Sequence, residues 1–272
     1  TRGMTSRRVT AHLSIDVVTP ATLVFEIAVA QAYVDLGGVV ETWTITRDGA
    51  PFPLPREIAA ADGARWHVLD AQPGQYVIDY WATVEGTVVS LPAPEVDALR
   101  FRRPSRYCES DTLAATARAE FAGLPSQDLL PAVASWVGTH LAYVPGSSGP
   151  TDGAVATLLA RRGVCRDFAH LVIAMLRGLD VPARLASVYA PGLSPMDFHA
   201  VAEAYVDGAW YVVDATTLAP RASLLRIATG SDAADTAFLS VHGGIANLME
   251  LEVSAVVDVL PQDDVTQLVQ LA

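Results

Sequence analysis

Three residues of this 272-residue chain have the types and spacing needed for nucleophilic chemistry: Cys165, His199 and Asp214. A cysteine thiol becomes a strong nucleophile when a base takes its proton, and that base needs a third group to fix its tautomer. A histidine and an aspartate can fill those two roles. If the three side chains meet in the fold, they could transfer an acyl group from a carboxamide or peptide carbonyl through a thioester.

The sequence around Cys165 predicts a helix that begins at or just after the cysteine. Apolar residues follow at the spacing of one wide helical face: Phe168, Leu171, Val172, Met175, Leu176 and Leu179. The unpaired N–H groups and the positive dipole end at a helix start both favour a thiolate. Taken alone, however, Cys165 would more often be an ordinary buried cysteine.

A hairpin predicts that the other two residues share one face of a sheet. Asp207 and Gly208 separate two strand-like runs, which is a strong hairpin signal. If these two residues form the turn, Val201 pairs with Asp214, and His199 lies diagonally across from Asp214 on the same face. Their Cβ atoms would then be about 7 Å apart. A slip of one residue in the pairing would place them on opposite faces.

An oxyanion formed at the attacked carbonyl would need hydrogen-bond donors. The backbone N–H of Cys165 at the helix start is one candidate. Tyr143 is a second, weaker candidate, because it precedes a loop over residues 145–150 that is rich in glycine, serine and proline. Such a loop is either mobile or shaped around something.

The remaining cysteine and histidines have structural interpretations. Cys108 is expected in the core or at an interface, and His12 and His67 are isolated histidines without a catalytic context. His170 lies about one and a half turns beyond the helix start, so it should point away from the thiol and pack. Asp167, in the first turn, is expected to stabilise the helix end.

The first third of the chain is typical of an antiparallel sandwich, with no convincing helix between residues 7 and 90. Short strand-like runs, separated by turn signals, cover residues 9–18, 22–30, 39–46, 65–69 and 75–84. Helical patterns follow from residue 110. We therefore expect a remnant ahead of Met4 (1–3), a β-sandwich domain (4–92), a linker (93–106), a core domain (107–260) and a weakly ordered acidic tail (261–272).

Composition argues against several classes of partner. The net charge is −12 and all 18 basic residues are arginine, so a nucleic-acid partner is not expected. The two cysteines lie 57 positions apart without CxxC spacing, and we expect neither a metal nor a cofactor. With no apolar run of membrane-spanning length and no signal-peptide pattern, we expect no membrane partner and a cytoplasmic location. Nothing in the sequence indicates the oligomeric state.

Several separated motifs together resemble the bacterial transglutaminase-like superfamily of predicted cysteine proteases. They are GVCRDFAHL (163–171), VPAR (181–184), DFHA (197–200) and GAWYVVDAT (208–216), with weaker similarity at 106–111 and 230–235. The resemblance implies an α+β fold: an N-terminal antiparallel β-sandwich followed by a papain-like core, in which a cysteine-bearing helix packs on an antiparallel sheet. It also implies that Cys165 is the nucleophile, His199 the base and Asp214 the residue that orients it.

The expected function is cysteine-dependent acyl transfer on a peptide or protein substrate. Hydrolysis, as by a peptidase or amidase, is the preferred alternative. Amine cross-linking of the transglutaminase type uses the same three residues and differs only in what resolves the thioester. A non-catalytic peptide-binding module remains a third alternative, although no member of the triad is missing.

Overall fold

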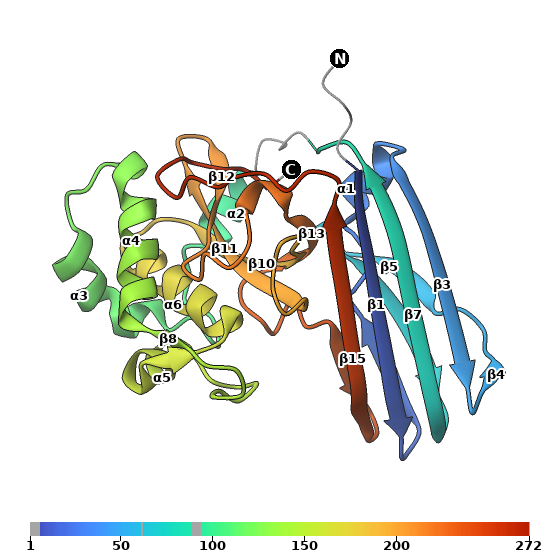
Figure 1. Cartoon of the computed structure of the whole chain (residues 1–272). Coiled ribbons are helices and arrows are strands. Elements are labelled where there is room, and N and C mark those ends of the chain that lie inside the picture. The colour runs from blue at the N-terminus through green and yellow to red at the C-terminus, as the bar shows by residue number, and fades with distance from the viewer. Residues whose placement is uncertain (1–5, 61, 89–93, 272) are drawn as a thin grey trace.

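The computed structural model describes residues 6–60, 62–88 and 94–271. A β-sandwich forms one side of the molecule, a group of helices forms the other, and a four-stranded sheet lies between them (Figure 1). This confirms the predicted α+β class. The proposed remnant at residues 1–3 lies outside the described residues, as do residues 89–93 around the expected domain boundary.

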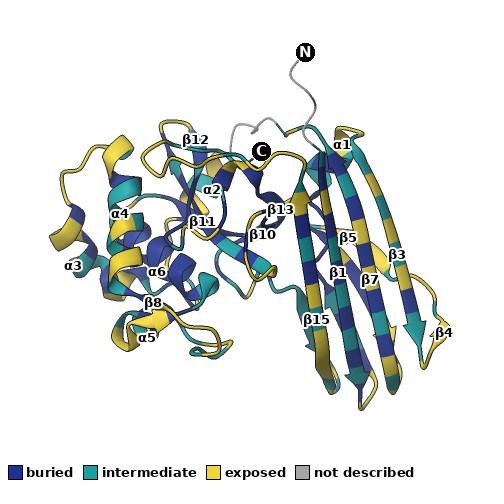
Figure 2. Ribbon diagram, viewed as in Figure 1, coloured by how far each residue is buried: buried dark blue, intermediate teal, exposed yellow. Residues whose placement is uncertain are grey.

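The sandwich consists of two antiparallel sheets. The larger has the order β15 (Ala246–Val257), β1 (Ser6–Val17), β7 (Gly74–Glu85), β3 (Val39–Arg47) and β4 (Ala50–Pro51). The smaller has the order β14 (Leu239–His242), β2 (Ala21–Phe25), β6 (Arg65–Ala71) and β5 (Arg56–Ala59). Burial alternates along β1, as expected for a strand with one face on the core (Figure 2).

Two details of the sandwich differ from the sequence prediction. A five-residue helix, α1 (Gln31–Asp35), follows β2, although no helix was expected before residue 90. One turn and a half is too short to show helical periodicity. More importantly, β14 pairs with β2 and β15 pairs with β1, so residues 239–257 lie in the sandwich rather than in a core that was expected to extend to residue 260. The alternation in β15 predicts a strand, but it does not specify the sheet.

The second half of the molecule has helices packed on one sheet. Its sheet has the order β12 (Ala209–Val213), β11 (Phe198–Val206), β10 (Ala183–Tyr189) and β13 (Leu225–Gly230). The helices are α3 (Ser110–Phe121), α4 (Ser126–His140), α5 (Ala154–Ala160) and α6 (Cys165–Gly178), and α2 (Glu95–Arg100) falls in the expected linker. Every residue of α6 from Asp167 onward is buried, because helices and sheet cover it on several sides.

The central sheet is joined to the sandwich by buried hydrogen bonds. The Tyr189 hydroxyl on β10 donates to the carbonyl of Ile27 at 2.8 Å, and the backbone N–H of Arg226 on β13 donates to the Tyr33 hydroxyl at 3.0 Å. Tyr189 and Leu225 belong to the same apolar cluster as the sandwich core. The sandwich therefore packs against the central sheet and can form one wall of a site on that sheet.

The C-terminal segment packs on the protein, although a weakly ordered tail was expected. The carbonyl of Val269 accepts a hydrogen bond of 2.7 Å from the N–H of Val212 on β12. Asp263 forms an ion pair of 2.9 Å with Arg221, a residue that is 7% exposed. Leu271 is buried. Among the described residues, no helix is long and apolar enough to cross a membrane.

Candidate active site

Cys165 is the first residue of α6, as predicted, and Asp167 fixes the start of that helix. The Asp167 carboxylate accepts a hydrogen bond of 2.8 Å from the N–H of Val164, which is half of a capping box. A Cβ at Gly163 would lie 2.6 Å from the Cβ of Asp167, so this close approach requires glycine. The expected role of Asp167 at the helix end is confirmed.

The glycine- and serine-rich loop is held against this helix start. The Ser148 hydroxyl donates to Asp167 at 2.5 Å. The Arg166 guanidinium donates to the carbonyl of Gly149 at 2.8 Å and to the Ser148 hydroxyl at 3.0 Å. Of the two alternatives for residues 145–150, a mobile or a shaped loop, these contacts favour the shaped one.

The β11–β12 hairpin has the predicted register. Val206 pairs with Ala209, and the two turn residues, Asp207 and Gly208, have positive φ angles of 49° and 86°, as a two-residue type I′ turn requires. Asp214 follows directly after β12. Its carboxylate lies 2.8 Å from Nε2 of His199.

The His199–Asp214 pair is buried, with side-chain exposures of 0% and 2%. Asp214 also accepts hydrogen bonds of 2.9 and 2.7 Å from the backbone N–H and hydroxyl of Thr216. Burial alone would raise the pKa of Asp214, but His199 and Thr216 outweigh burial and hold this pKa below its usual value. The carboxylate is therefore fixed in its charged form beside the imidazole.

The structure also brings Cys165 to this pair. Burial alone would lower the pKa of His199, but the charge and hydrogen bond of Asp214, together with contact with the Cys165 thiol, raise it to about 10. The Nδ1 atom of His199 is buried and makes no hydrogen bond with the described residues. With Nε2 directed at Asp214, Nδ1 is the atom left to exchange a proton with the sulfur.

Tyr143 lies at the same cysteine. It is on the two-residue strand β8 (Ala142–Tyr143), which pairs with β9 (Arg162–Gly163) so that Tyr143 is opposite Gly163. Burial and interaction with the Cys165 side chain raise the pKa of the Tyr143 hydroxyl to about 12, and this hydroxyl also contacts the Cys165 backbone. The hydroxyl therefore stays protonated at neutral pH and can donate a hydrogen bond.

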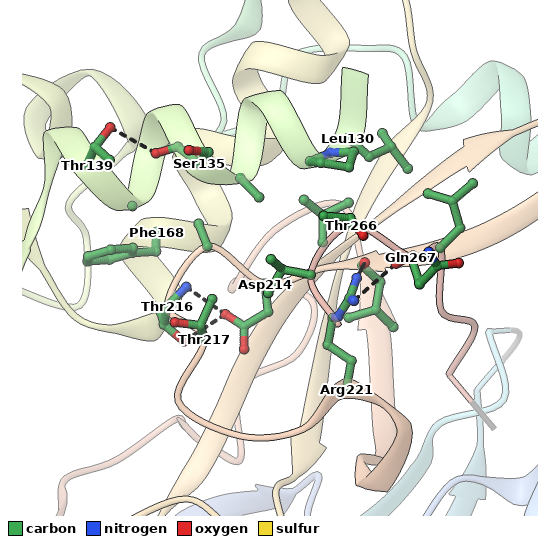
Figure 3. Close-up of a pocket in the computed structure, with 18 of the residues that line it drawn as sticks. Leu130, Ser135, Thr139, Phe168, Asp214, Thr216, Thr217, Arg221, Thr266 and Gln267 are labelled. Atoms are coloured by element: carbon green, nitrogen blue, oxygen red, sulfur yellow. Dashed lines mark hydrogen bonds between the residues drawn. The ribbon is translucent and has the colours of Figure 1, made fainter. Parts of the chain in front are cut away.

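Two cavities flank these residues. One, of about 400 Å³, is lined by Cys165 and His199 and by residues of the sandwich, including Glu26, Leu239 and Leu251. The other, of about 560 Å³, lies on the Asp214 side beneath α4 and the C-terminal segment, with Thr216, Arg221 and Gln267 in its wall (Figure 3). The first is the candidate substrate cleft, because it alone of these two contains both the thiol and the imidazole.

Glu26 is a residue of this cleft that the sequence does not predict. Its chain neighbours are apolar, and its position next to a strand end carries no catalytic signal. Glu26 reaches the cleft because the strands that cover it come from residues more than two hundred positions later. Only the three-dimensional pairing of β14 and β15 could reveal this.

The residues predicted to be structural lie away from the thiol chemistry. His170 is fully buried, stacks on Tyr107 at 5.5 Å and accepts a hydrogen bond of 3.1 Å from the N–H of Ala233. Burial lowers its pKa to about 4, so it is neutral. Burial raises the pKa of the Cys108 thiol to about 12, which makes that thiol unreactive.

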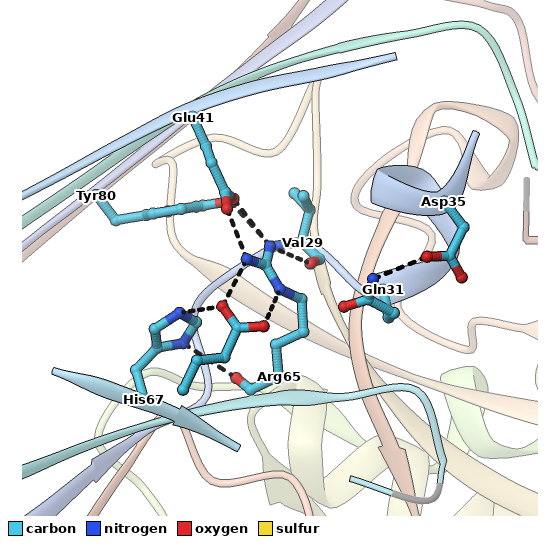
Figure 4. Close-up of polar contacts among 8 residues, drawn as sticks. Val29, Gln31, Asp35, Glu41, Arg65, His67 and Tyr80 are labelled. Atoms are coloured by element: carbon cyan, nitrogen blue, oxygen red, sulfur yellow. Dashed lines mark hydrogen bonds and ion pairs between the residues drawn. The ribbon is translucent and has the colours of Figure 1, made fainter. Parts of the chain in front are cut away.

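His67 belongs to a polar cluster that connects the two sheets of the sandwich (Figure 4). Arg65 on β6 forms ion pairs of 2.6 Å with Glu41 on β3 and 2.9 Å with Glu57 on β5. His67 lies 3.3 Å from Glu57, and burial lowers its pKa. His12 on β1 pairs across the strand with Asp79 at 2.6 Å. In the part of the chain that the structure describes, no group of three or more potential metal ligands occurs.

The chain is similar to known proteins in sequence and in fold. A sequence profile of the transglutaminase-like superfamily matches residues 109–215. A crystal structure from Cytophaga hutchinsonii, named "Putative Cysteine Protease", is similar over 96% of this chain and 93% of that chain, with a TM-score of 0.84 and 30% sequence identity. Both matches support a cysteine-dependent enzyme.

Uncharacterised mycobacterial proteins are also similar to parts of the chain. One from Mycobacterium leprae is 28% identical over 159 residues, which are 46% of this chain and 57% of that protein. One from Mycobacterium tuberculosis is 42% identical over 65 residues, which are 24% of this chain and 21% of that protein. The matches to these two relatives therefore span only part of their length. The full-length structural match and the superfamily profile together show that the chain belongs to the transglutaminase-like superfamily.

Proposed function

We propose that the protein hydrolyses a peptide or carboxamide bond through a thioester on Cys165. The single observation that carries the proposal is the buried His199–Asp214 pair at 2.8 Å, whose imidazole contacts the thiol at the start of α6. His199 is assigned as the general base and acid. Asp214 is assigned as the residue that holds the imidazole in one tautomer.

The reaction would proceed in two halves. The Cys165 thiolate, whose proton is held on Nδ1 of His199, attacks the carbonyl carbon, which forms a C–S bond and an oxyanion. The C–N bond then breaks, and His199 returns the proton to the leaving amine. In the second half, His199 takes a proton from water, the hydroxide attacks the thioester, and the released thiolate recovers the proton as the carboxylic acid departs.

Two groups are assigned as donors to the oxyanion: the backbone N–H of Cys165 and the Tyr143 hydroxyl. Cys165 is the first residue of α6, and the Tyr143 hydroxyl contacts its backbone. A single donor of this kind is typically worth about 3 kcal/mol in the transition state. In the free protein the Tyr143 hydroxyl contacts the Cys165 backbone, so this contact must exchange for one with the substrate oxygen.

Product analysis in oxygen-18 water tests the proposal. The protein would be incubated with a peptide-amide library, with and without an added primary amine, and the products would be analysed by mass spectrometry. Hydrolysis predicts one oxygen-18 atom in each new carboxylate, and no turnover by the Cys165→Ala variant. Amine-linked products in place of acids would favour cross-linking, and tight peptide binding without products would favour a binding module.

A further inference from the structure

We propose that Glu26 is a specificity residue that binds an ammonium group of the substrate, either a lysine-type side chain or a free α-amino group. The inference rests on the proposed function, since it concerns the substrate of the same cleft. It says that the substrate carries a cationic group, which the sandwich domain binds beside the reacting carbonyl.

Glu26 reaches the cleft from the sandwich. Its backbone N–H donates to the carbonyl of Phe238 at 3.1 Å, which anchors it next to β2. Its side chain lines the cavity that also contains Cys165 and His199. It also lines a neighbouring cavity of about 500 Å³. The carboxylate is therefore placed between the reactive residues and a second hollow that could admit more of the substrate.

Among the described residues, the carboxyl group of Glu26 has no ion-pair partner. The residue is 6% exposed, and its Oε2 atom has no hydrogen-bond partner among the described residues. The Trp66 side chain is its side-chain hydrogen-bond donor. Of the nearby cations, Arg100 pairs with Asp235 at 3.9 Å, and Arg166 is bonded to the loop over residues 145–150. No ion pair found among the described residues includes Glu26.

Among the described residues, the other buried carboxylates accept hydrogen bonds from several groups, and Glu26 differs from them. Glu203 accepts hydrogen bonds of 2.7 Å from two nitrogens of Arg226 and one of 2.8 Å from Arg184. Asp167 and Asp214 each accept several hydrogen bonds within the site. An unpaired buried carboxylate costs stability, and such groups cluster at functional sites.

The surroundings of Glu26 suit an ammonium group on an apolar stem. The cleft wall near it is mainly apolar: Leu185, Phe198, Ile227, Phe238, Leu239 and Leu251. The neighbouring cavity adds the carboxylates of Asp62 and Asp235. Burial and these two acidic neighbours raise the pKa of Glu26 to about 8, so a bound ammonium group would displace its proton and restore the charge. An amine held protonated in this way is not a nucleophile, so this site fits a recognition group better than an attacking amine.

Binding measured without turnover tests the inference separately from the reaction. Titration calorimetry on the Cys165→Ala protein would compare N-acetyl-lysine methylamide with N-acetyl-norleucine methylamide, which differ in the ammonium group. A second pair, alanine methylamide and N-acetylalanine methylamide, tests the α-amino source. In at least one pair, the cationic member is expected to bind about tenfold more tightly, and this preference should disappear when Glu26→Gln is added.

Glu26→Gln is a near-isosteric change that keeps an oxygen for Trp66, and its fold can be checked by thermal unfolding. Glu250→Gln, on the exposed part of β15, removes the same charge outside the cleft and should keep the preference. Equal binding within both pairs, or a preference that survives Glu26→Gln, would overturn the inference. Absence of turnover with every peptide would contradict the proposed function but leave this binding result intact.

Discussion

The substitution Glu26→Gln is expected to stabilise the protein at alkaline pH, although it replaces a carboxyl group of the candidate substrate cleft by an amide. In the folded protein the pKa of Glu26 is raised from 4.5 to about 8, chiefly by burial. Between these two values the folded state holds a proton that the unfolded chain has released. The contribution of Glu26 to stability is therefore fully present below pH 4.5 and is lost as the pH rises to 8.

The size of the effect follows from this difference. Each pKa unit corresponds to about 1.4 kcal/mol, so the rise from 4.5 to about 8 represents about 5 kcal/mol of lost stability once the group is charged. Glutamine does not titrate and avoids this loss. We therefore expect the free energies of unfolding of the two proteins to be similar near pH 4.5, and the variant to be more stable by several kcal/mol at pH 9.

Urea unfolding at a series of pH values between 4.5 and 9 measures this difference, with Glu250→Gln as the control that removes one exposed carboxylate. The control curve should run parallel to that of the wild type. If the difference between Glu26→Gln and the wild type does not grow with pH, then Glu26 is not an unpaired buried carboxylate. Glu26 would then also not be expected to bind an ammonium group.

Three further substitutions test the site and its support. Asp214→Asn removes the charge that raises the pKa of His199, so we expect that pKa to fall in an NMR titration and turnover to drop by about 10²–10⁴-fold. Tyr143→Phe should lower kcat by about 10²-fold with little change in KM if the hydroxyl stabilises the oxyanion; a change in KM alone would argue against this role. Glu203→Gln leaves two largely buried guanidinium groups unpaired and should cost about 3–5 kcal/mol in urea unfolding at pH 7. Because its two arginine partners lower the pKa of Glu203 to about 2, the wild type should also lose this contribution as the pH falls from 4.5 toward 2.

The turn between β11 and β12 and the buried face of α6 could be predicted from the sequence, because each depends on residues close to it in the chain. Asp207 and Gly208 adopt the positive φ angles of a two-residue turn, and this turn alone sets the register that places His199 beside Asp214. The apolar spacing after Phe168 predicts the buried face of α6. Both signals lie within a few residues of the structure that they determine.

The features that depend on distant segments could not be predicted. The alternation of β15 identifies a strand, but its partner β1 is more than two hundred residues away. The acidic residues of the tail predict a solvated segment, but Asp263 pairs with Arg221, which begins the short 3-10 helix Arg221–Ser223. Glu26 likewise becomes a buried residue of the cleft only when β14 and β15 return to the sandwich.

The pH dependence of thiol alkylation tests the central claim most directly. Folded protein would be treated with iodoacetamide between pH 5 and 9, and the rate at Cys165 would be followed by peptide mass spectrometry, with buried Cys108 as the internal control. Asp214 and the contact with Cys165 raise the pKa of His199 to about 10, so a positively charged imidazolium lies beside the sulfur at pH 6. We predict rapid alkylation of Cys165 at pH 6 that is lost in His199→Ala, whereas a rate no faster than that of a free thiol would contradict the catalytic assignment.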